Sequence, residues 1–79
     1  MNESKDISYE VVKHLGVLDT TQNGWTKEAN IIRWNGGEPK LDIRDWNPEH
    51  NRMNKGITLK GPQARKLAEL LYEEFRGKP

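Results

Sequence analysis

The chain has 79 residues and a formal net charge of +1 at pH 7, from 13 Lys and Arg against 12 Asp and Glu. This length suits one domain and is too short for most enzymes. The chain contains no Cys, which excludes a disulfide framework, a Cys-ligated zinc site and a thiol nucleophile. Leu, Ile, Val and Phe supply 16 of the 79 residues, so we expect a thin core that a partner subunit would enlarge.

Residues 1–8 are expected to form a flexible N-terminus. Met1 to Asp6 is polar and carries both charge signs, which is unlike a signal peptide. No apolar run approaches the roughly 18 residues that a membrane-spanning helix needs. These features favour a cytoplasmic location.

Two strands are predicted in the first half of the chain. Tyr9 to Leu18 is rich in β-branched and aromatic residues, with Gly16 as a bulge or bend. Asp19 to Gly24 has the composition of a turn. Trp25 to Trp34 then reads as a strand, and alternation places three of its side chains on one face, namely Asn30, Ile32 and Trp34.

A hairpin and two further strands follow. Residues 35–39 (NGGEP) predict the hairpin, and Lys40 to Trp46 predicts a strand with two different faces. Leu41 and Ile43 point to the expected core, and the other side carries Lys40, Asp42, Arg44 and Trp46. After a polar loop at residues 47–54, Lys55 to Leu59 predicts a short strand.

A helix is predicted from Pro62 to Phe75, with Pro at its first position and Gly77 after its end. Its apolar residues cover an arc of about 200°, wider than one small sheet can bury. The surplus predicts a two-fold interface between helices of two subunits, formed by Leu67, Leu70, Leu71 and Phe75.

The fold class is therefore α+β: a four-stranded antiparallel β-meander followed by one C-terminal helix (ββββα), dimerising through the helix. Residues 9–76 form the single domain and residues 77–79 a C-terminal tail. One helix covers only one face of a sheet, so the other face must be wet or bind something.

The expected open face combines cations with aromatic rings. Lys40, Arg44 and Trp46 share one side of a strand, Trp34 ends the adjacent strand, and Lys13 and Lys27 are candidates to join them. Cations that follow phosphates and rings that stack on unpaired bases suit single-stranded nucleic acid. The alternative is that the Trp residues are core and the cations solvated surface. Asp42 is expected to pair with a nearby cation.

Arg44 is expected to form a bidentate contact with a phosphate or to lie flat on a base. We expect it to have no role in the fold beyond pairing with Asp42 or a neighbouring acid. No catalytic or metal-binding motif accompanies the two histidines. His14 and His50 are 36 positions apart and lack the spacing of a catalytic triad or metal site, so they are interpreted as surface residues. We therefore expect no enzyme activity, no cofactor and no metal.

The segments Leu41 to Trp46 (LDIRDW) and Lys55 to Leu59 (KGITL), followed by a helix, resemble the positive-cofactor-four (transcriptional coactivator) family. The similarity extends through Gly24 to Glu28 (GWTKE), Trp34 to Gly36 (WNG), and Pro39 to Pro48, as in the small bacterial YdbC-like branch. It covers roughly residues 9 to 72. Two features of the eukaryotic members are absent: a second aromatic after Trp46, where this chain has Asn47, and a long Ser- and Lys-rich tail.

The resemblance implies a helix-mediated homodimer whose curved sheets bind single-stranded DNA without sequence preference. It implies a base-stacking role for Trp34, a backbone contact for Arg44 and a phosphate contact for Lys55. Together with the residue pattern, it gives this set of expected nucleic-acid-binding residues: Lys13, Trp25, Lys27, Asn30, Trp34, Lys40, Arg44, Trp46 and Lys55.

The expected function is single-stranded DNA binding in transcription, replication or repair, with RNA as a further ligand and the transcription or replication machinery as a partner. The alternative is a protein-interaction module that uses the apolar helix and the sheet edge. The sequence does not distinguish DNA from RNA, or a base-stacking Trp46 from one that supports the sheet.

Overall fold

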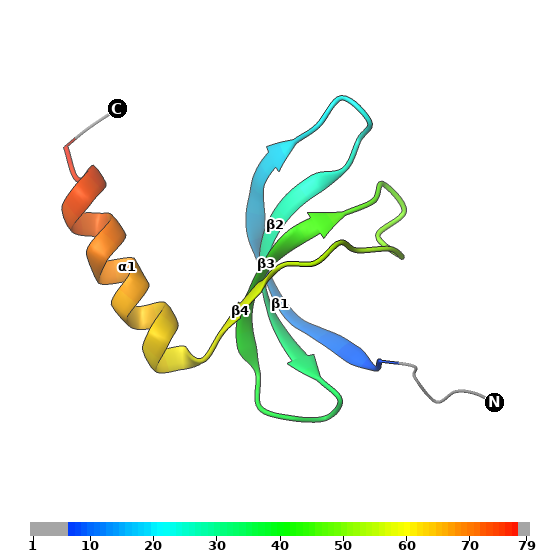
Figure 1. Ribbon diagram of the computed structural model, residues 1–79, viewed down its shortest axis with the longest axis horizontal. Helices are drawn as coiled ribbons and strands as arrows, with labels where there is room; N and C mark the ends of the chain where they lie inside the picture. The colour runs from blue at the N-terminus through cyan, green and yellow to red at the C-terminus, as the bar shows by residue number, and fades with distance from the viewer. Residues whose placement is uncertain (1–6, 78–79) are drawn as a thin grey trace.

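The computed structural model describes residues 7–77, so most of the predicted flexible N-terminus and of the predicted C-terminal tail lies outside the described residues. Four strands form one antiparallel sheet in the order β1-β2-β3-β4, and one helix follows them (Figure 1). The predicted α+β meander is confirmed. The elements are β1 (Tyr9–Thr20), β2 (Thr26–Trp34), β3 (Lys40–Trp46), β4 (Ile57–Leu59) and α1 (Gly61–Phe75).

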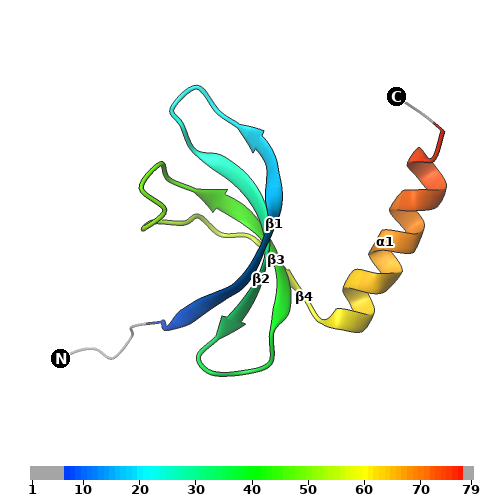
Figure 2. The ribbon, with the colours of Figure 1, turned by 180° about the vertical axis from the view of Figure 1, so that it is seen from behind.

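The sheet is strongly bent because β1 is irregular. Its pairing with β2 shifts register three times, between Val11 and Lys13, between His14 and Gly16, and between Val17 and Asp19. Each such bulge adds a residue to one strand and increases the local twist. The two ends of the sheet therefore curve away from α1, as Figures 1 and 2 show.

The fully buried residues lie on the side of the sheet that curves inward. We call this side the concave face and define it by β-ladder partners that share it: Tyr9, Val11, His14, Val17, Thr20, Thr26, Glu28, Asn30, Ile32, Trp34, Lys40, Asp42, Arg44, Trp46 and Thr58. Ile32 and Trp46 have 0% exposure there. The opposite, convex face carries Ala29, Ile31, Leu41, Ile43, Ile57 and Leu59.

The predicted faces of β2 and β3 are thus correct, but the predicted location of the core is wrong. Leu41 and Ile43, expected to be the core side, are only half-buried. The reason is the curvature, which brings the aromatic side chains of the concave face into contact with one another. The convex face is left for the helix.

The helix α1 stands beside the sheet and contacts only β3 and β4 (Figure 1). None of its residues is buried, and Ala64 and Leu67 alone are half-buried. Leu70, Leu71 and Phe75 are 55%, 47% and 58% exposed. The apolar surface of this helix therefore lacks a cover within residues 7–77. In that described part of the chain, no helix is long and apolar enough to cross a membrane.

Close backbone packing fixes the start of β4 against β3. A Cβ atom at Gly56 would overlap the carbonyl oxygen of Ile43 and the side chain of Arg44. A residue without a side chain is therefore required where the Lys55 to Leu59 segment crosses β3.

Candidate nucleic-acid interface

An aromatic cluster occupies the concave face. The ring of Tyr9 lies 5.8 Å from that of Trp34 and 5.7 Å from that of Trp46. His50, from the loop after β3, stacks on Trp46 with ring centroids 4.0 Å apart and an interplanar angle of 5°. Because Trp34 and Trp46 stand at opposite ends of the paired strands, only a strongly bent sheet brings both to the same tyrosine.

The Arg44 guanidinium is held in the middle of this face by a buried ion pair. Its Nε and Nη2 donate to the two carboxylate oxygens of Asp42, at 2.6 and 2.7 Å. Asp42 is 0% exposed and also accepts from Thr58 at 3.1 Å. The guanidinium lies 4.8 Å from the ring centroid of Trp34, and its Nη1 donates to the carbonyl of Asn54. The expected pairing of Asp42 is therefore found.

These contacts correct the expectation that Arg44 has little role in the fold. Its side chain is only 13% exposed, and each of its three nitrogens donates a hydrogen bond within the chain. A buried bidentate pair orients both groups and excludes water from them. In this structure Arg44 shapes the face and supports the Trp34 ring.

A second polar network surrounds Glu28, which is 5% exposed. Its carboxylate accepts from Thr26 at 2.6 Å, from Asn30 at 3.2 Å and from His50 Nε2 at 2.9 Å. Burial acts to raise the pKa of Glu28. The hydrogen bonds from Thr26, His50 and Asn30, together with the charge of His50, outweigh burial and hold the pKa below its ordinary value. Glu28 is therefore a buried anion at neutral pH.

The loop between β3 and β4 is built to place His50 over this network. The Asn47 side chain accepts from the backbone N–H groups of Asn51 and Arg52, at 2.9 and 2.8 Å. His50 has a φ of 61°, a left-handed conformation that costs a non-glycine residue about 1 kcal/mol or more. The stack on Trp46 and the bond to Glu28 offset this cost.

The structure sorts the expected nucleic-acid-binding residues by position. Trp34, Lys40 and Arg44 share the concave face with Asn30 and Trp46. Asn30 and Trp46 are 0% exposed, so we reassign both from ligand contact to support of the face. Lys55 is exposed just before β4.

Two other predicted cations are elsewhere. Lys13 pairs across the sheet with Ile31, and Lys27 pairs with Asp45, so both lie on the convex face. Lys27 also forms a 3.1 Å ion pair with Asp45. Their expected place beside Arg44 is corrected. Alternation alone could not predict the face of Lys13, because that face depends on how many bulges precede this residue in β1.

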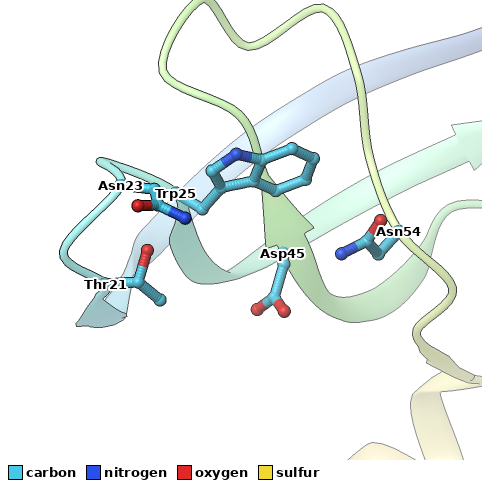
Figure 3. A pocket seen from close by; sticks show the side chains of 5 residues that line it. All are labelled: Thr21, Asn23, Trp25, Asp45 and Asn54. Carbon is cyan, nitrogen blue, oxygen red and sulfur yellow. The ribbon is translucent and has the colours of Figure 1, made fainter.

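Trp25 lies in a shallow pocket at the end of the sheet (Figure 3). The pocket has a volume of about 420 Å³ and is lined by Thr21, Asn23, Trp25, Asp45 and Asn54. Figure 3 shows Thr21 and Asn23 on one side of the indole and Asn54 on the other. An aromatic face with amide and carboxylate groups suits an uncharged planar ligand better than a phosphate.

His14 and His50 are the functional candidates that sequence reasoning missed. Their interpretation as surface residues is confirmed, because both are exposed, but they also converge on Glu28, with His14 Nδ1 at 3.7 Å and His50 Nε2 at 2.9 Å from the same carboxylate oxygen. The signal in the sequence is weak, because the contact depends on the loop conformation. Within residues 7–77, no group of His, Cys, Asp and Glu is arranged to hold a metal ion.

Comparison with known proteins places this chain in a family. Residues 21–70 match the family model described as Transcriptional Coactivator p15 (PC4). The chain belongs to the PC4 family. It is also similar to an uncharacterized protein of Treponema pallidum (strain Nichols), with 44% identity over 66 residues, which cover 84% of this chain and 78% of that protein. This relative supports a small bacterial branch of the family, and PC4 membership indicates nucleic-acid binding in transcription-related processes.

Proposed function

We propose that a homodimer of this chain binds single-stranded DNA without sequence preference, in transcription, replication or repair, and that it does so without catalysis. The observation that carries the proposal is the cluster of Tyr9, Trp34 and Arg44 on the concave face of a PC4 family member. Single-stranded RNA is proposed as a further ligand, to be compared with DNA. The transcription or replication machinery is the proposed protein partner, and the cytoplasm is the proposed location.

The chemistry of the face favours unpaired nucleotides. Tyr9 is 38% exposed and Trp34 is half-buried, so each has ring surface on which a splayed base can stack. Stacking tolerates every base because all bases have a flat π-face. Lys40 beside these rings and Lys55 ahead of β4 supply cations for the phosphates. A duplex keeps its bases paired and stacked, so it cannot use the rings.

The uncovered helix supports the dimer. Leu70, Leu71, Tyr72 and Phe75 expose large apolar side chains along α1, and Val12, Leu15 and Leu18 do so on β1. Several large apolar side chains exposed along one helix are typical of an interface between proteins. A second copy presenting the same helix would cover it symmetrically.

Titration with labelled oligo-dT, oligo-rU and a duplex of equal length tests the binding proposal. We expect the single strands to bind at least tenfold more tightly than the duplex, with little difference between oligo-dT and a mixed sequence. The logarithm of the affinity should fall with the logarithm of salt concentration by about 0.7 for each phosphate contacted. Equal affinity for duplex and single strand would contradict the stacking proposal and favour a simple basic patch.

The exposed apolar helix also favours a second candidate function, a protein-interaction module. This function would use α1 and the sheet edge to bind a partner protein, with the concave face acting only as core. It predicts no retardation of oligo-dT in a gel at micromolar protein, whereas the proposed function predicts a retarded band.

A further inference from the structure

We propose that His14 and His50 form a proton-linked phosphate-contact site on the concave face, so that single-stranded DNA binding is coupled to the uptake of protons by these two imidazoles. This inference rests on the proposed function. It adds two ligand-contacting residues to the face and makes its affinity depend on pH. The ligand is the phosphate backbone of a single strand.

The two imidazoles are the accessible polar groups beside the buried network. The side chains of His14 and His50 are 53% and 42% exposed, whereas that of Glu28 is 6% exposed. His14 comes from β1, Glu28 from β2, and His50 from the loop after β3. A single strand of DNA lying on the concave face would contact the exposed imidazoles before it reached the buried carboxylate.

The hydrogen bonds fix which ring nitrogens carry protons in the neutral state. His50 Nε2 faces a carboxylate oxygen of Glu28 at 2.9 Å, and a carboxylate accepts only, so Nε2 must donate. His14 Nδ1 lies 2.7 Å from the amide oxygen of Asn30, whose amide nitrogen donates to Glu28, so Nδ1 must donate too. The second nitrogen of each neutral ring, Nε2 of His14 and Nδ1 of His50, is then an unprotonated acceptor.

Protonation changes what these second nitrogens offer to a ligand. In the neutral rings they are lone pairs, which repel a phosphate oxygen. In the imidazolium form they are N–H donors that carry positive charge, which attract one. Histidine is the side chain that changes charge between about pH 5 and 8. Binding of a polyanion should therefore draw protons onto the pair, and lower pH should tighten binding.

The charged groups that face the pair lie on β2, on β3 and in the loop after β3. On β2, Glu28 is held as an anion by its own hydrogen bonds. On β3, Asp42 and Arg44 neutralise each other in the buried ion pair, and Lys40 is the remaining cation of the concave face. In the loop, Glu49 accepts a hydrogen bond from Asn47. One carboxylate thus serves two imidazoles, and protonating both leaves a net positive site for a phosphate.

His50 is also positioned rigidly enough to act as a contact. The parallel stack on Trp46 and the bond to Glu28 hold the ring in place above a left-handed backbone. A fixed donor loses less conformational freedom on binding than a mobile surface side chain.

The test measures oligo-dT affinity at pH 5.5 and pH 8, using wild type and the double variant His14→Gln, His50→Gln. Oligo-dT is chosen because thymine does not titrate in this range, and Gln keeps an N–H donor without gaining charge. We expect wild type to bind roughly tenfold more tightly at pH 5.5, with a salt slope steeper by about 0.7 per protonated imidazole that meets a phosphate. In the double variant the ratio of affinities should fall close to one.

Matched controls keep the result interpretable. Glu69→Gln removes a titratable group from the polar side of α1 and should retain the wild-type ratio. Glu28→Gln removes the central anion and should move the tightening to lower pH. Melting curves of each variant at both pH values show whether the fold is kept.

The possible outcomes distinguish failure of this inference from failure of the proposed function. A double variant that keeps the wild-type pH ratio and salt slopes would overturn the inference, because the protons would then bind elsewhere. Wild type that binds oligo-dT equally at both pH values would overturn it too, and would leave the proposed function standing. Failure of wild type to bind oligo-dT at either pH would instead remove the proposed function.

Discussion

Leu70→Asp and Leu71→Asp are each expected to convert a dimer into monomeric or unfolded chains. Both side chains are about half exposed on α1, and no residue of this helix is buried in the single chain. If two copies bury these residues against each other, an Asp there places a charge in an apolar interface at a cost of several kcal/mol. Sedimentation velocity at tens of micromolar measures the mass directly.

The control for this experiment is Arg65→Asp. Arg65 lies outside the apolar arc of α1, so this variant adds the same side chain to the same helix and should remain dimeric. Wild type that sediments at 9.2 kDa under these conditions would remove the helix-mediated dimer, together with the interface predicted for Leu67 and Phe75.

Arg44→Ala is expected to destabilise the fold by about 3 kcal/mol, because it leaves the carboxylate of Asp42 buried without its partner. This revises the expectation from sequence that Arg44 has no strong role in the fold. The double variant Asp42→Asn, Arg44→Met should recover most of the lost stability, since replacing both members of a buried pair is often close to neutral. Urea unfolding measures the free energy of each variant.

The same three proteins separate the role of Arg44 in the fold from its role in binding. If the folded double variant binds oligo-dT roughly tenfold less tightly than wild type, the guanidinium also acts on the ligand, directly or through the Trp34 ring. An Arg44→Ala protein as stable as wild type would show that the ion pair with Asp42 contributes little. That result would return Arg44 to the group of free phosphate contacts.

The elements and the faces of the strands follow from local sequence. In β3, alternation separates Leu41 and Ile43 from Asp42, Arg44 and Trp46, and the structure keeps that separation. The α1 helix follows from its composition and from Pro62, and its wide apolar arc is the exposed surface now seen. These features depend on neighbours within a few residues, which the sequence displays.

The site depends on contacts that no local pattern contains. Whether a face is buried depends on the bending of the sheet, and three irregularities in β1 produce that bending. They bring Tyr9 to both Trp34 and Trp46, so Trp46 is buried while the rings of Tyr9 and Trp34 stay partly exposed. The approach of His50 to Glu28 needs a left-handed residue in a loop of polar side chains. Alternation in the sequence therefore predicted correctly which side chains share the concave face. It did not predict that several of them are buried.

The most direct test of the central claim is to map the contact surface by NMR while single-stranded DNA is added. The three Trp indole N–H signals report three places: Trp34 in the aromatic cluster, Trp46 beneath His50, and Trp25 in the side pocket. We predict that oligo-dT shifts the indole signal of Trp34, the ring signals of Tyr9 and the imidazole signals of His50. The signals of Lys13 and Lys27, on the convex face, should not shift. Shifts confined to the convex face, with Trp34 and Tyr9 unmoved, would contradict the account.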